Sequence, residues 1–263
     1  MKEVENLSPL QIFLNIFKRN DIESVVKNTA WLMFDKIFRL VVGLFVNVWI
    51  ARYLGPAQFG ILSYALSFAA IIGAIAPLGL DSIVVRELVK DASRKEYLLG
   101  TTLGLRLLSG MFVMLIALTF YLFNTSLDLQ TLTLILIISA GYFFQAFDAI
   151  DYWFQSKIKS KFTVIAKDAA FFIVSVLKVV ALLAQASLMI FAALATVEII
   201  LGSAALWVAY RYDGSKLRSC KFNMQYTRFL LKDSFPLAIA SIAIAVYMRI
   251  DQVILGSLLG SSA

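Results

Sequence analysis

The stretch that decides the fold is TAWLMFDKIFRLVVGLFVNVWIARYLGPAQFG, residues 29–60. Residues 29–51 are long and apolar enough to cross a bilayer, because roughly 20 apolar residues at a rise of ~1.5 Å span ~30 Å of hydrocarbon. The Gly-Pro pair at positions 55 and 56 predicts a turn. We therefore predict one transmembrane helix over 29–51 and a second over 57–80.

The rest of the chain has the composition of an integral membrane protein. Its 263 residues are 60% hydrophobic, whereas a soluble domain is closer to half apolar. The same criteria of length and hydropathy predict an all-α polytopic membrane protein with seven transmembrane helices. The predicted spans are residues 29–51, 57–80, 103–123, 130–152, 163–184, 188–210 and 234–257.

The composition also argues against several classes of function. The chain has no histidine, which is the commonest general base and metal ligand. Its single cysteine, Cys220, can form neither an intramolecular disulfide nor a cysteine metal cluster. The chain contains no glycine-rich phosphate loop or nucleotide motif, and the predicted external connections are short. We expect no catalytic residue, no metal site and no enzymatic activity.

The basic residues predict the orientation in the membrane rather than nucleic-acid binding. Seventeen of the 24 lysine and arginine residues precede the first span or lie in the connections after the second, fourth and sixth. The alternate connections hold only Arg52. Basic connections stay on the cytoplasmic side, so we expect a cytoplasmic N-terminus and an extracytoplasmic residue 263. Residues 1–28 carry an amphipathic stripe, which predicts a helix lying in the inner-leaflet interface or packed under the bundle.

Charged residues also lie within the predicted spans. Asp35 and Arg39 are four residues apart and so meet on one helix face, which Asn47 continues and Lys36 borders. Charges at membrane depth are costly, so this face is expected to line a bundle interior or a wet cavity. The alternative is that these charges reach the headgroups at the cytoplasmic end.

The later spans carry further charges. Lys167 and Lys178 are eleven residues apart and point the same way, whereas Arg249 and Asp251, two apart, project to nearly opposite faces. Arg106 lies near the cytoplasmic start of its span, where we expect it to reach the headgroups. Two more carboxylates share a face near the cytoplasmic end of the fourth span: Asp148 and Asp151.

Two interpretations of these charges remain open. In one, the deep cations line a hydrated, positively charged cavity that attracts an anionic head group. In the other, they form buried ion pairs between helices, and the chain offers four acidic partners for them. Those partners are Asp35, Asp168, Glu198 and Asp251.

Three segments resemble one family of membrane proteins. They are FDKIFRLVVGLFVNVWIARYLGPAQFGILSYA at 34–65, PLGLDSIVVRELVKD at 77–91 and YMRIDQVILG at 247–256. These segments are similar to the bacterial polysaccharide (O-antigen) flippases of the multidrug/oligosaccharidyl-lipid/polysaccharide transporter superfamily. The ARYLGPAQFG turn together with the GLDSIVVREL segment is the most specific part of the resemblance.

The resemblance implies a flippase that moves undecaprenyl-pyrophosphate-linked oligosaccharide across the bacterial cytoplasmic membrane, as in lipopolysaccharide synthesis. It implies two helical lobes around a cationic cavity, alternating access, possible coupling to a proton or sodium gradient, and no cofactor. Glycan polymerase and chain-length proteins are the implied partners besides membrane lipids. By position, Asp35, Lys36, Arg39, Arg249 and Asp251 match cavity residues of the family.

The resemblance also assigns a cytoplasmic gate. Arg86 and Glu87 match the polar end of the family's second span, and we assign Asp148 and Asp151 to the same rim. Together with the cavity face already described, which includes Asn47, these residues make up the predicted site.

The chain departs from the family in length. Members of the family usually have twelve or fourteen spans, and this sequence contains seven, so we expect that it does not flip substrate alone. The alternatives are a multidrug or cation exporter of the same superfamily, or a non-transporting membrane fragment or interaction protein. The expected units are a cytoplasmic segment (1–28), a six-helix lobe (29–210), a cytoplasmic connection (211–232) and a seventh helix beginning a second lobe (233–263).

Overall fold

The computed structural model describes residues 19–124, 127–215 and 219–258, and these residues contain helices and no strand. The amphipathic stripe predicted before residue 19 lies outside the described residues. Two short 3-10 turns, Ala92–Arg94 and Gln145–Asp148, separate some of the α-helices. The α-helices are α2 (Arg19–Gly73), α3 (Leu80–Lys90), α4 (Lys95–Phe123), α5 (Leu129–Phe144), α6 (Ala149–Ser156), α7 (Ser160–Leu183), α8 (Leu188–Tyr212) and α9 (Met224–Leu258).

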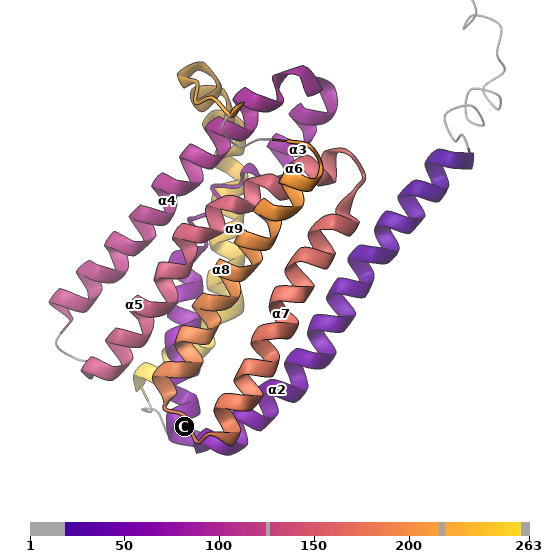
Figure 1. Cartoon of the computed structure of the whole chain (residues 1–263). Helices are drawn as coiled ribbons and strands as arrows, with labels where there is room; N and C mark the ends of the chain where they lie inside the picture. The colour runs from indigo at the N-terminus through magenta and orange to yellow at the C-terminus, as the bar shows by residue number, and fades with distance from the viewer. Residues whose placement is uncertain (1–18, 125–126, 216–218, 259–263) are drawn as a thin grey trace, which may run out of the picture.

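Helix α2 contains the first two predicted spans and the turn between them. At Gly55 the backbone leaves the helical region, with φ of 71° and ψ of 172°, and Pro56 follows. Glycine adopts a positive φ at little steric cost, and proline fits the first turn of the helix that follows. In Figure 1, α2 runs down one side of the bundle, turns at the bottom and returns upward. It ends at Gly73, so the second predicted span is shorter than expected.

Five helical stretches have the length and hydropathy of membrane spans. The outer faces of the bundle expose large apolar side chains, such as Leu40, Leu44 and Phe45 on α2, as expected for a surface that contacts lipid. Helix α7 is 24 residues long but carries Lys167, Asp168 and Lys178, and it is not among the five. The five candidate spans are Val26–Gly73, Ala92–Phe123, Leu129–Ser156, Leu188–Tyr212 and Met224–Leu255.

The basic connections gather at one end of the bundle. Figure 1 shows the start of α2, helix α3, the turn between α6 and α7, the end of α8 and the start of α9 all at the upper end. The turn within α2 and the connection from α7 to α8 lie at the lower end. The described part of the chain therefore follows the alternation that the basic residues predict.

Helix α9 packs directly against α2, α3 and α4. Gly79, just before α3, has φ of 63°, and a Cβ atom there would lie 2.5 Å from the backbone nitrogen of Ala238 in α9. Only glycine fits such a close approach of two backbones. Ser67 of α2 also donates a hydrogen bond to the side-chain oxygen of Gln252. These contacts join the seventh predicted span to the helices before it.

Candidate functional site

Arg39 is the centre of a charged cluster between α2, α7 and α8. Its Nε lies 2.6 Å from Oδ1 of Asp35, one turn earlier on α2, which confirms that the two residues meet on one face. The same Nε lies 3.0 Å from Oδ1 of Asp168 on α7, and Nη1 lies 3.8 Å from Oε1 of Glu198 on α8. The guanidinium carbon also lies 5.0 Å from the centre of the Phe171 ring. One arginine therefore forms ion pairs with three carboxylates from three helices.

Glu198 extends this cluster to a second cation. Nζ of Lys178 lies 3.2 Å from its Oε2, and the lysine side chain is only 16% exposed. Asp168 is 8% exposed, and neither of its carboxylate oxygens has a hydrogen bond of good geometry in the described part of the chain. Its stabilisation therefore comes from the charge of Arg39, and loss of that cation would leave a buried acid unpaired.

A second charged cluster lies around Lys167 of α7. Its Nζ lies 2.9 Å from Oδ1 of Asp148 and 3.6 Å from Oδ2 of Asp151. Gln155 donates a hydrogen bond to Asp151 at 3.1 Å. The predicted polar face at the end of the fourth span thus points at α7 and contacts Lys167.

Arg106 belongs to the second cluster, and our expectation that it reaches the headgroups is wrong. The residue is 3% exposed, donates a hydrogen bond to the hydroxyl of Tyr152 and lies 3.9 Å from Oδ2 of Asp148. Tyr152 in turn donates to Asp81 at the start of α3. These partners inside the bundle hold the two terminal nitrogens of the guanidinium, although its Nε is buried without a hydrogen-bond partner among the described residues.

A short 3-10 turn shapes the space between the two clusters. The fourth predicted span is not one continuous α-helix, because α5 ends at Phe144 and the turn Gln145–Asp148 precedes α6. Ser203 of α8 donates a hydrogen bond of 2.8 Å to the carbonyl of Phe144, where the helix changes form. Such 3-10 segments inside a helix often mark hinges. The turn places Gln145 and Asp148 at the same cavity.

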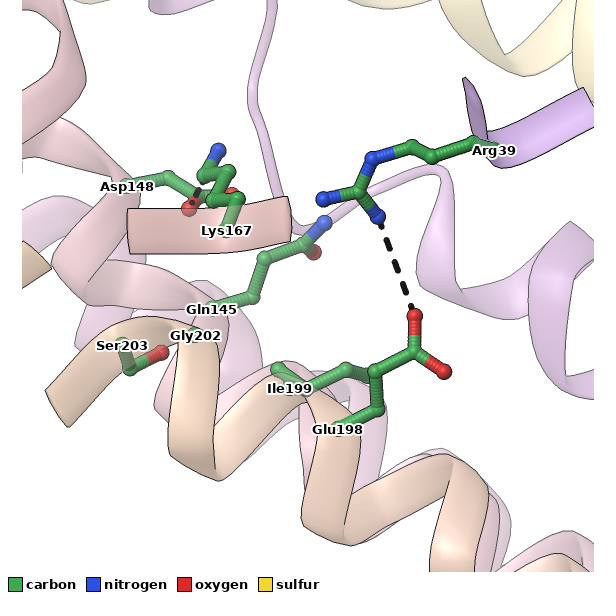
Figure 2. Close-up of a pocket in the computed structure, with 8 residues that line it drawn as sticks. All are labelled: Arg39, Gln145, Asp148, Lys167, Glu198, Ile199, Gly202 and Ser203. Carbon is green, nitrogen blue, oxygen red and sulfur yellow. Dashed lines mark ion pairs between the residues drawn. The ribbon is translucent and has the colours of Figure 1, made fainter. Parts of the chain in front are cut away.

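That cavity has a volume of about 200 Å³ and connects the two clusters. Figure 2 shows the amide of Gln145 between the Lys167–Asp148 pair and Arg39, which faces Glu198. The Oε1 atom of Gln145 is buried without a hydrogen-bond partner among the described residues. The lining residues are Arg39, Gln145, Asp148, Lys167, Glu198, Ile199, Gly202 and Ser203.

The charges around the cavity are mixed rather than mainly positive. The two clusters hold four cations: Arg39, Lys178, Lys167 and Arg106. These four cations contact five carboxylates. These carboxylates are Asp35, Asp168, Glu198, Asp148 and Asp151, with Asp81 joined through Tyr152. The pairing that the sequence left open is therefore present, and the paired groups surround an open polar cavity.

Four predicted cavity residues lie away from this cavity. Lys36 is 83% exposed and lies 3.9 Å from Asp35, and Asn47 is exposed on α2. Arg249 and Asp251 are exposed on α9, and neither forms an ion pair with a described residue. The chain as described brings Asp35, Arg39, Lys167 and Lys178 together but not these four.

The predicted gate residues on α3 contact the start of α9. Nη2 of Arg86 lies 2.8 Å from Oδ2 of Asp233, and its Nε lies 3.0 Å from Oε1 of Glu87. Lys90 donates to the same Glu87 oxygen at 2.9 Å. The hydrogen bond from Lys90, aided by Arg86, holds the pKa of Glu87 below its ordinary value despite partial burial. Asp148 and Asp151, assigned to the same rim, belong to the second charged cluster.

Several residues of the cavity and of the two charged clusters were outside the predicted site. Glu198 was expected only as a partner, although a lone carboxylate midway along a span is a signal of a polar interior. Tyr152 and Ser203 offered no such signal, because hydroxyl-bearing residues are common in membrane helices and their partners lie far away in the sequence. The described residues contain no group of three or more Asp, Glu or Cys side chains that could hold a metal ion.

The comparisons with known proteins support one family. The family model for polysaccharide biosynthesis proteins matches residues 25–263, which cover nearly all of the chain. No curated protein and no solved structure matches it. The match includes both charged clusters, the Gly55 turn and α9. The chain therefore belongs to the polysaccharide biosynthesis protein family, a family of membrane flippases within the multidrug/oligosaccharidyl-lipid/polysaccharide transporter superfamily.

Proposed function

We propose that this chain is part of a flippase that moves undecaprenyl-pyrophosphate-linked oligosaccharide across the cytoplasmic membrane by alternating access. Membership of a family of membrane transporters implies a lipid-linked glycan substrate and a role in polysaccharide export. The observation that supports a transport role most directly is the polar cavity beside Arg39 and Lys167 inside a bundle with an apolar exterior. Ionisable groups at membrane depth are typical of substrate or ion pathways.

The proposed topology has seven crossings. The Gly55 turn supports a division of α2 into two spans, and the ion pairs of Lys167 and Lys178 offset the cost of α7 in the bilayer. Residues 29–210 then form the first lobe, 211–232 the cytoplasmic connection, and 233–263 the start of a second lobe. The gathering of basic connections at one end supports a cytoplasmic N-terminus and an extracytoplasmic residue 263.

In this proposal the exposed polar residues face the central path of the transporter. Lys36, Asn47, Arg249 and Asp251 are exposed in the described chain, so they are free to contact an anionic head group or a second lobe. The paired cations, Arg39 among them, then act inside the lobe by holding α2, α7 and α8 in one arrangement. A change in that pairing would shift the helices together, which suits alternating access coupled to a proton or sodium gradient.

One observation favours the second candidate, a cation exporter of the same superfamily. The two charged clusters hold five directly paired carboxylates and four cations, and Asp168 is buried with Arg39 as its one cationic partner among the described residues. An acidic interior attracts cationic substrates rather than phosphates. The two candidates therefore predict opposite signs of substrate charge.

Deletion and complementation of the gene separate the two candidates. We expect deletion to abolish surface glycan, the wild-type gene to restore it, and Arg39→Gln and Arg249→Gln each to lower it at normal protein abundance in the membrane. Lys232→Gln, an exposed cation outside both clusters, is the matched control. Undiminished glycan in both arginine variants would contradict the role of these cations. Intact glycan combined with sensitivity to cationic dyes after deletion would favour the exporter.

A further inference from the structure

A second, larger pocket lies at the junction of α3, α4 and α9, away from the charged clusters. Its volume is about 560 Å³. Arg86 and Lys90 come from α3, Arg94 from the turn before α4, and Tyr226, Phe229 and Asp233 from α9. Helix α3 and the start of α9, which line the pocket, lie at the end of the bundle where the basic connections gather (Figure 1). We propose that this pocket binds the phosphate of an anionic phospholipid of the inner leaflet.

The cations of this pocket are available to a ligand. The side chains of Lys90 and Arg94 are 60% and 56% exposed, and each contacts one acid, Glu87 at 2.9 Å and Asp91 at 2.7 Å. Arg86 already contacts both Glu87 and Asp233, so Lys90 shares its acid with a second cation. Exposed pairs of this kind contribute little to stability, so a phosphate that accepts several charge-assisted hydrogen bonds can replace or join them.

The apolar wall of the pocket indicates a lipid rather than a free phosphate. Phe229 is 41% exposed, and Leu98 forms a buried floor. Tyr226 stacks on Tyr97 with ring centres 6.1 Å apart and planes 10° apart, which holds its ring in place. A free phosphate gains nothing from such a surface, whereas the glycerol and upper acyl chains of a phospholipid can pack on it.

The position of the pocket supports the same ligand. On the orientation proposed above, this end of the bundle lies at the cytoplasmic surface, where anionic lipids are concentrated and basic pockets between helices bind their headgroups. Aromatic side chains such as Tyr226 are also typical of that level in the membrane. A lipid in this pocket would contact α3 and α9 together, so it would stabilise the packing of α9 against the first lobe.

Lipid binding to the purified protein tests this inference without any transport assay. Phosphatidylglycerol retained by the detergent-solubilised protein is measured by native mass spectrometry, with phosphatidylcholine and inorganic phosphate as comparison probes. We expect K90Q/R94Q to weaken phosphatidylglycerol retention about thirtyfold, because each of the two cations near the surface contributes on the order of 1 kcal/mol and about 1.4 kcal/mol corresponds to a factor of ten. K90R/R94K keeps both charges and is expected to retain the lipid.

A matched double variant distinguishes a site from general attraction. R228Q/K232Q removes two exposed cations from the same end of α9 outside the pocket, and we expect it to retain phosphatidylglycerol as the wild type does. Phe229→Ser should weaken lipid retention without changing the response to phosphate. Equal losses in the two double variants, or competition by inorganic phosphate as strong as by the lipid, would overturn the proposal. Neither result bears on whether the transporter exports glycan, so this proposal and the proposed function can fail separately.

Discussion

Arg39→Gln provides the sharpest test of the charged cluster. The change removes the only cation among the described residues that lies within 4 Å of Asp168, and it leaves Asp35 without its 2.6 Å partner. Loss of one partner from a buried ion pair costs roughly 3–5 kcal/mol, and the cost is lower where the group is partly exposed. Because the Arg39 side chain is 30% exposed, we expect a loss of about 2–3 kcal/mol in the free energy of unfolding.

Asp168→Asn should have a much smaller effect, although Asp168 is the more buried residue. It leaves Arg39 with Asp35 and Glu198, and it removes a carboxylate whose oxygens lack hydrogen bonds in the described chain. We expect a loss below about 1 kcal/mol, and we expect the double variant to be more stable than Arg39→Gln alone by about 1 kcal/mol. Lys36→Gln, at an 83% exposed position, should change stability by less than about 0.5 kcal/mol.

The assay is unfolding of the purified protein in mixed micelles with increasing denaturing detergent, followed by circular dichroism. The comparison of interest is the order of the variants rather than any single value. If Asp168→Asn lowered the free energy of unfolding as much as Arg39→Gln, the inference that one cation neutralises several carboxylates would be refuted. A double variant that loses the sum of both single changes would refute it as well, because independent sites add.

Two further changes test the packing of α9 and a polar contact at the end of α8. Gly79→Ala should lower the free energy of unfolding by about 3 kcal/mol, because alanine is strained at a positive φ and its Cβ would clash with the α9 backbone. Gly214→Ala, where φ is 78° and the space around the residue is open, should lower it by about 1 kcal/mol in the same assay. Equal losses in the two variants would contradict the clash at Gly79. Burial raises the pKa of Asp213, but hydrogen bonds from Trp153 and Lys159 hold it below its ordinary value. The stability from this carboxylate is therefore present above the unfolded pKa and lost as pH falls through the folded one, so Asp213→Asn should be less stable than wild type at pH 7 and equal to it in strong acid. A difference that persists in acid would show that the charge is not responsible.

The expectations that held depend on local spacing. The i, i+4 pair of Asp35 and Arg39 follows from helix geometry alone, and the Gly-Pro pair marks the turn at Gly55. The alternation of basic connections is likewise visible along the chain, because each connection contributes its own lysines and arginines. The expectation for Arg106 failed because its partners, Tyr152 and Asp148, are more than 40 residues away.

The candidate site likewise has features that the sequence predicts and features that only the packing of the helices decides. Amino-acid order alone indicates a helical membrane protein with charges inside its spans and places it near the polysaccharide flippases, because hydropathy and helical period act over neighbouring residues. The packing of α2, α7 and α8 decides that Arg39 meets Asp168 and Glu198, and the 3-10 turn after α5 decides that Gln145 reaches the cavity. Such pairings depend on which helices lie side by side and how each is rotated, and sequence periodicity carries no information on either.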